Sequence, residues 1–161
     1  MTDLNKLFTP IFLNEKEIRK LMELIFFSYR DFTSGPDKIL EKIQFGRAHH
    51  RIIYFVGKKN EITIKDLLTI LQITKQSLSR VLNQLVKEKY IKVSTGNDKR
   101  TKKLSLTTKG IELEKKLSNI QINKIKNVLK KAKEINVNGF KKILYEMIDE
   151  DIKKIFNRLN N

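Results

Sequence analysis

The chain has 161 residues, which suits one domain, or one small module with a helical appendage, and allows a genuine hydrophobic core. It contains no cysteine, which excludes a disulfide framework, a thiolate zinc site and a cysteine nucleophile. Charged side chains interrupt every apolar run well before the roughly 20 residues that a membrane-spanning helix needs. Met1 to Ile18 show no export signal, so we expect a cytoplasmic protein.

The charge is strongly basic: 34 Lys and Arg against 18 Asp and Glu give a formal charge of +16. The segment from Glu41 to Gly110 alone holds 16 basic and 5 acidic residues. AT-rich codon usage raises Lys throughout a protein, but it does not lower the acidic content of one segment. We therefore expect a polyanionic partner.

The first elements in chain order are expected to be two helices. Ile18, Leu21, Met22 and Ile25 have the spacing of one helical face and predict a helix from Glu15 to Phe32. The Ser34–Asp37 cluster, which contains Gly and Pro, is expected to end this helix and to start a second one that runs to about Val56.

Two short helices joined by a turn are expected next. A short strand at Glu61–Thr63 precedes a helix marked by Ile64, Leu67, Leu68 and Leu71. Thr74 can cap a following helix, and that helix repeats the apolar period at Leu78, Val81, Leu82 and Leu85.

From Tyr90 the apolar period changes to two residues, which predicts a β-hairpin around the polar tip Thr95–Arg100. Thr107 or Thr108 is expected to cap a long helix from about Lys109 to Lys133. After Asn136–Asn138 a last helix is expected to reach about Leu159. Its apolar stripe comprises Phe140, Ile143, Leu144, Met147, Ile148, Ile152, Ile155, Phe156 and Leu159.

A helix-turn-helix followed by a hairpin is the order of a winged helix, so the fold class is mainly α with a small β-hairpin wing. In such a fold the second helix enters the major groove of DNA, and its outer face carries the readout. With the four apolar positions buried, a step of 100° per residue leaves a polar face for DNA. The candidate DNA-binding residues of this recognition helix are Thr74, Lys75, Gln76, Ser77, Ser79, Arg80, Asn83 and Lys87.

These residue types match the chemistry of base and phosphate contacts. Arg pairs bidentately with guanine, and Gln or Asn pairs with adenine. Ser, Thr and Lys position the protein on phosphates. A solvated helix face has a similar composition, but this one has no acidic residue before Glu88.

The hairpin supplies a second set of candidates, which would meet phosphates or a narrow minor groove. An acid in the tip is explained either by pairing with Arg100 or by a bond to its own backbone. The candidate wing residues are Asp98, Lys99, Arg100, Lys102 and Lys103.

The residues resemble the MarR family of bacterial regulators. The similar motifs are the recognition segment Ile73–Leu82, the tip Asp98–Arg100 and the segment Leu106–Gly110 that opens the long helix. The stretch Gly46–Arg51 resembles an alphaproteobacterial branch of that family.

The resemblance implies a homodimeric transcriptional regulator that binds double-stranded DNA. It places dimerising helices at 1–44 and 111–161 around a winged helix-turn-helix lobe at 45–110, with the recognition helix at about 74–88 and the wing at about 90–107. It also implies a pocket for a small-molecule effector between the helices and the lobe. Candidate pocket residues are Tyr29, Phe32, Phe45, His49, Arg51 and Tyr54.

No phosphate-binding glycine loop, nucleophile elbow or paired carboxylate frame is present, so we expect no enzymatic activity and no cofactor. His49 and His50 are the only histidines and point about 100° apart on a helix, which argues against a metal site. Two alternatives stay open: a nucleoid or RNA-binding protein without sequence preference, and a winged-helix module that binds protein.

Overall fold

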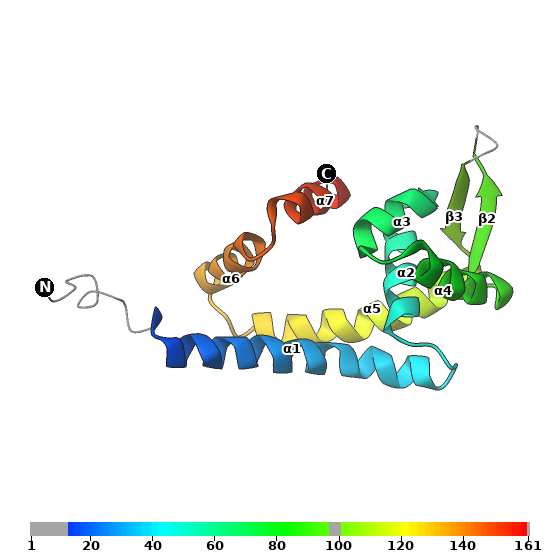
Figure 1. The fold of residues 1–161 in the computed structure, drawn as a ribbon. Helices are drawn as coiled ribbons and strands as arrows, with labels where there is room; N and C mark the ends of the chain where they lie inside the picture. Colours follow the sequence, from blue (N-terminus) through cyan, green and yellow to red (C-terminus); the bar gives the residue numbers. More distant parts are fainter. Residues whose placement is uncertain (1–12, 97–100, 161) are drawn as a thin grey trace, which may run out of the picture.

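The computed structural model describes residues 13–96 and 101–160. Two long helices lie side by side along the base of the molecule, a lobe with a small sheet stands at one end of them, and two further helices form an arm (Figure 1). In chain order the elements are α1 (Glu15–Glu41), α2 (Arg47–Lys58), β1 (Ile62–Thr63), α3 (Ile64–Leu71), α4 (Lys75–Lys87), β2 (Ile91–Thr95), β3 (Lys102–Leu106), α5 (Thr108–Leu129), α6 (Glu134–Glu146) and α7 (Glu150–Asn160).

The first helix does not end at Ser34–Asp37, so that prediction is wrong. α1 continues through Pro36 to Glu41. Proline has no N–H for the carbonyl of Phe32, but the side-chain amide of Gln121 on α5 donates to that oxygen at 3.4 Å. Gly35 is needed for close packing, because a Cβ there would lie 2.7 Å from the side chain of Ile120. Contacts with α5 thus keep the helix continuous across a sequence that favours a break.

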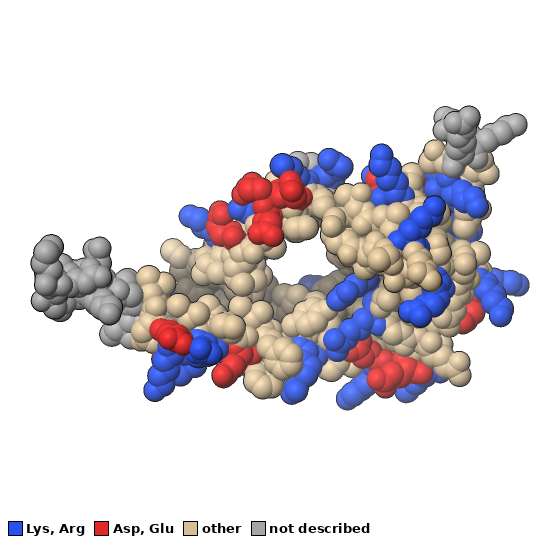
Figure 2. Space-filling view, in the orientation of Figure 1, with Lys and Arg blue, Asp and Glu red and all other residues tan. Residues whose placement is uncertain are grey.

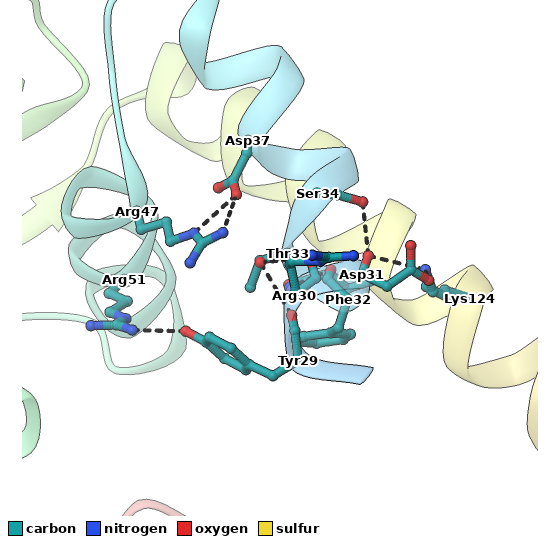
Figure 3. A network of polar contacts seen from close by, with 11 residues as sticks. Tyr29, Arg30, Asp31, Phe32, Thr33, Ser34, Asp37, Arg47, Arg51 and Lys124 are labelled. Atoms are coloured by element: carbon teal, nitrogen blue, oxygen red, sulfur yellow. Dashed lines mark hydrogen bonds and ion pairs between the residues drawn. The ribbon is translucent and has the colours of Figure 1, made fainter. Parts of the chain in front are cut away.

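The chain turns instead at residues 42–46, and the second helix begins only at Arg47. Gln44 adopts a positive φ of 56°, and Gly46 precedes α2 in an extended conformation. An ion pair between Arg47 and Asp37, at 2.9 Å, fixes the start of α2 against α1 (Figure 3).

The winged helix-turn-helix has the predicted order. β3 lies between β1 and β2 in an antiparallel sheet, with Ile62 and Val93 both opposite Leu104. The observed fold is therefore mainly helical with a small sheet, and the fold-class prediction is confirmed. The hairpin tip at 97–100 lies outside the described residues.

The hydrophobic core lies in this lobe and at the adjoining ends of α1 and α5. Leu40, Ile52, Leu67, Leu85 and Leu104 are each fully buried there. The start of α5 is also hydrogen-bonded to the lobe. Thr107 caps α5 by accepting from the N–H of Gly110 at 3.1 Å, while its hydroxyl donates to the carbonyl of Lys89 at 2.6 Å.

Gly110 has a steric role in the same contact. A Cβ at this position would collide with the carbonyl oxygen of Tyr90. Only glycine lets the first turn of α5 approach the end of α4 this closely.

The C-terminal region departs from the prediction of one last helix. α5 ends at Leu129, Asn136–Asn138 lie inside α6, and a break at 147–149 separates α6 from α7. Exposed asparagines cost a helix only fractions of a kcal/mol, so the apolar period overrides them. The run Asp149–Asp151 marks the true start of α7, because acidic residues favour a helix N-terminus.

The arm formed by α6 and α7 contains no buried residue. It leaves the end of α5 and returns toward α3, and Lys58 at the end of α2 donates to the side-chain oxygen of Asn160 at 3.0 Å. The space-filling view shows an opening through the molecule between the arm and the lobe (Figure 2). In the described part of the chain, no helix is long and apolar enough to cross a membrane.

Candidate nucleic-acid interface

The turn before α4 sets the angle between the two helices of the helix-turn-helix. Gln72 caps the C-terminal end of α3 and takes the left-handed conformation with φ 51° and ψ 43°. Its backbone N–H donates to the carbonyl of Leu68 at 3.0 Å, and its side-chain amide donates to the carbonyl of Thr69 at 2.7 Å. A non-glycine residue in this conformation is held by these contacts, so the turn is well defined.

Thr74 caps α4, as the sequence predicts. Its hydroxyl oxygen accepts from the N–H of Ser77 at 3.2 Å, and its hydroxyl donates to the side chain of Ser77 at 3.0 Å. Thr74 is therefore already committed to the helix start. Its exposed position still leaves the neighbouring N–H groups of the first turn open to an anion.

α4 divides into a buried face and an exposed face. Leu78, Val81, Leu82 and Leu85 are buried in the lobe. Outside that buried stripe lie all the candidate DNA-binding residues of the recognition helix, each of them exposed: Thr74, Lys75, Gln76, Ser77, Ser79, Arg80, Asn83 and Lys87.

The cations on this face form no ion pair within the part of the chain that the structure describes. Among the described residues, no carboxylate forms an ion pair with Lys75, Arg80 or Lys87. Figure 2 shows further Lys and Arg side chains spread over the visible face of the lobe that carries α4. Unpaired cations on an otherwise uncharged polar face attract a polyanion and keep their donors available to it.

The two candidate wing lysines that the structure describes differ. Lys102 is exposed, whereas Lys103 is half-buried and forms an ion pair with Glu61 at 2.8 Å. Lys103 is thus partly neutralised by the loop before β1. Asp98, Lys99 and Arg100 lie outside the described residues, so their predicted contacts stay predictions.

Comparisons with known proteins agree with this geometry. The model of the MarR family matches residues 43–101. A curated relative, the HTH-type transcriptional regulator PetP of Rhodobacter capsulatus, is 38% identical over 154 residues, which are 95% of this chain and 93% of the relative. The chain belongs to the MarR family.

Solved structures of MarR-type regulators share the fold. Streptococcus pneumoniae FabT, in complex with DNA, superposes with a TM-score of 0.72 and 18% identity over 81% of this chain and 94% of FabT. A MepR–DNA complex from S. aureus gives a TM-score of 0.62 and 22% identity over 78% of this chain and 94% of MepR. The branch that Gly46–Arg51 resembles is the one that includes PetP.

The MarR-family chain also has a cavity of about 440 Å³ between α1, α2 and α5. Of the predicted pocket residues, Tyr29, Phe32, Arg51 and Tyr54 line it. The guanidinium of Arg51 donates to the hydroxyl of Tyr29 at 2.8 Å across the cavity (Figure 3).

The other two predicted pocket residues lie elsewhere. Phe45 is buried in the core, and its ring stacks on that of His49 with centroids 4.4 Å apart. His49 turns toward α4, where its Nε2 lies 2.9 Å from the side-chain oxygen of Gln84. Neither residue is part of the cavity lining.

Sequence reasoning missed several polar residues of the cavity, including the ionisable residues Arg47 and His50. Burial lowers the pKa of His50, with the negative charge of Asp37 opposing that shift, so its imidazole is neutral near pH 7. The signal was present in the helical period, because Arg47 and Arg51, like His50 and Tyr54, are four residues apart on one face of α2. The described residues include no group of three or more His, Asp and Glu side chains placed to hold a metal ion.

Proposed function

We propose that this MarR-family chain is a cytoplasmic, non-enzymatic homodimer that represses or activates transcription by binding a near-palindromic DNA operator. One observation carries the proposal: the exposed face of α4 presents polar side chains suited to base contacts and cations that form no ion pair within the described residues, while its apolar residues are buried beneath. A recognition helix in a winged helix needs this division.

Each group on that face has a distinct role. Arg80 lies near the middle of α4 and is placed for bidentate pairing with guanine. Gln76, one turn before it, and Asn83, almost one turn after it, suit adenine. Lys75 and Lys87, at the two ends of the helix, suit phosphates on either side of the groove.

The proposal of a dimer rests on exposed apolar surface. In α1, every residue from Leu21 to Asp31 is exposed, including Met22, Leu24 and Phe26. In the arm, Phe140 and Ile143 are 56% and 59% exposed. Apolar surface of this extent is rare on a monomer, and a second copy of the chain would cover the same helices on both partners.

Such a dimer presents two recognition helices related by a two-fold axis. They fit successive major grooves about 34 to 36 Å apart, which predicts an inverted repeat. The relatives support this assignment, since FabT and MepR are described in complex with DNA. A nucleoid-type protein would bind through charge alone and would not need Gln76, Arg80 and Asn83 together on one face.

Selection from a library of random DNA duplexes at about 150 mM salt tests the proposal. We expect the wild type to enrich an inverted repeat. Arg80→Ala should relax one position in each half-site at a cost of about 1 to 3 kcal/mol.

Lys116→Ala is a matched control, because it removes one positive charge from an exposed site on α5. This variant should select the same DNA sequence as the wild type. Enrichment of no sequence, with tight binding that weakens steeply in salt, would favour the nucleoid-type alternative. No binding to DNA would favour the protein-interaction alternative.

The cavity supports a second part of the proposal, an effector that modulates DNA binding. Phe32, Phe55 and Ile122 make its wall apolar, while Arg51 places a cation in it that donates to the Tyr29 hydroxyl and forms no ion pair within the described residues. An apolar molecule with one anionic group fits this chemistry.

A panel of small aromatic and aliphatic carboxylates, each with its neutral amide, tests the effector. Carboxylates should raise the melting temperature of the wild type more than the amides do. Arg51→Met should remove that preference. Equal responses to acids and amides in the wild type would contradict an anionic effector.

A further inference from the structure

A chain of hydrogen bonds joins the start of α2 to the recognition helix. The backbone N–H of Gly46 donates to Nδ1 of His49 at 3.1 Å. On the other side of the ring, Nε2 of His49 lies 2.9 Å from Oε1 of Gln84 on α4. The side-chain amide of Gln84 then donates to Glu88 at 3.0 Å.

The first of these bonds fixes the direction of the others. An Nδ1 that accepts from Gly46 carries no proton, so the ring proton lies on Nε2. Nε2–H therefore donates to Gln84, and the amide of Gln84 is left to donate to Glu88. Each link of the chain thus joins one donor to one acceptor, and the orientation of the Gln84 amide is determined.

The His49 ring is itself held in place. It lies parallel to the ring of Phe45, with an interplanar angle of 3°. Phe45 is buried and also contacts the ring of Tyr90 at 5.2 Å, just beyond the end of α4. A stacked ring fixed on the core is a rigid support for the bond to Gln84.

Gln84 lies at a sensitive position on α4. It is four residues after Arg80 and one after Asn83, so it borders the face proposed to read bases. Gln84 is half-buried, in contrast to the exposed residues of that face. Its side chain points back to α2 and is not free to contact DNA.

The same turn of α2 also faces the cavity. Arg47, His50 and Arg51 line it, while His49 between them points to α4. A shift of α2 in response to an occupant of the cavity would move His49 and, through Gln84, the recognition helix.

We propose that His49 and Gln84 are positioning residues that hold the recognition helix against α2 and thereby determine how sharply the protein distinguishes its operator from other DNA. This inference rests on the proposed DNA-binding function of α4. Base contacts need side chains placed within a fraction of an ångström, whereas phosphate contacts tolerate more movement. Loss of the bond should therefore weaken operator binding and leave binding to random DNA unchanged.

A double-mutant cycle tests the proposal. His49→Phe keeps a ring on Phe45 but removes both hydrogen bonds, and Gln84→Met keeps the side-chain length but removes the acceptor. Each variant should lower the ratio of operator to random-duplex affinity by about three- to tenfold. The double variant should lose no more than the larger single loss, because the two residues act through one bond.

Amide hydrogen exchange of the free protein gives a readout that does not depend on DNA. Both variants should speed exchange in the last turn of α4 and leave the middle of α5 unchanged. Wild-type protein that ignores DNA sequence would contradict the proposed function. The hydrogen-exchange measurement would still decide whether His49 and Gln84 hold α4. The inference would be overturned if both variants exchanged amide hydrogens in the last turn of α4 as slowly as the wild type. It would also be overturned if the losses of operator affinity multiplied in the double variant.

Discussion

The lobe and the arm of this chain differ in where their apolar side chains lie. The lobe buries its apolar residues within one chain, from Leu40 to Leu117. The arm, with the first half of α1, shows the same apolar helical period but buries none of it. The lobe is therefore stabilised by its own core, whereas we propose that a second copy of the chain covers the arm.

The division also separates two functions. We propose that readout depends on the lobe, where α4 packs on buried leucines and contacts His49. Spacing between two readout helices depends on the arm, which we propose to be the dimer interface. Substitutions in the two regions should consequently affect different measurements.

The largest effect is expected from the arm. The double substitution Phe140→Glu/Ile143→Glu places charges on side chains that are exposed in the single chain. It should leave the lobe folded but dissociate the dimer, and operator affinity should fall at least about 100-fold because the two half-sites are no longer bound together. Sedimentation and DNA titration measure the two effects.

Lys141→Glu is the control, since this residue lies on the same helix and is already exposed and charged. It should leave the dimer intact. A Phe140→Glu/Ile143→Glu protein that stays dimeric and keeps wild-type affinity would show that the arm is not the interface.

A smaller but still large effect is expected in the lobe from Gly110→Ala. The new Cβ would collide with the carbonyl of Tyr90, so α5 has to shift away from the end of α4. The free energy of unfolding should fall by about 2 to 4 kcal/mol in urea titrations. Gly139→Ala in α6 has open space around it and should instead stabilise by about 0.5 to 1 kcal/mol. Equal effects at both glycines would contradict the packing described.

Asp66 gives the lobe a modest pH dependence. Burial alone would raise its pKa, but hydrogen bonds from Thr63 and the positive charges of Lys59 and Arg158 outweigh burial and lower it. Because the folded pKa lies below the unfolded one, the contribution is present above the unfolded pKa of about 3.9 and is lost as the pH falls through the folded value.

Asp66→Ala should therefore cost about 1 kcal/mol at pH 7, and the difference from wild type should shrink below about pH 4. Urea titrations of both proteins across this range provide the measurement. A difference that stays constant down to pH 2.5 would exclude the carboxylate of Asp66 as its source.

The smallest expected effect compares two lysines of the wing. Lys102→Ala should reduce the slope of log affinity against log salt by about one, the loss of one phosphate contact. Lys103→Ala should reduce it less, because Glu61 already neutralises that side chain. Equal slopes for the two variants would contradict the difference in their environments.

The sequence was sufficient to predict the elements of the lobe from β1 onward because their signals are local, whereas the start of α2 was misplaced. Thr74 and Thr107 are caps recognisable by residue type, and the buried stripe of α4 follows directly from helical period. The polar face of α4 then follows by geometry.

Long-range contacts explain what the sequence did not reveal. Pro36 stays inside α1 because Gln121, distant in the chain, bonds the carbonyl that proline leaves open. His49 faces Gln84 and not the cavity because the ring stacks on Phe45, which no local pattern indicates. The break between α6 and α7 had a local signal in Asp149–Asp151, but the continuous apolar period concealed it.

Changing the distance between half-sites tests the central claim most directly. With the selected operator in hand, binding is measured on duplexes that carry five or ten extra base pairs between its halves. A dimer that holds two recognition helices at a fixed separation should lose affinity to the level of a single half-site on the five-base-pair duplex, where the second half faces the opposite side of the DNA. Affinity that is unchanged by the five-base-pair insertion would contradict the account, because the two readout helices would then act independently of the arm.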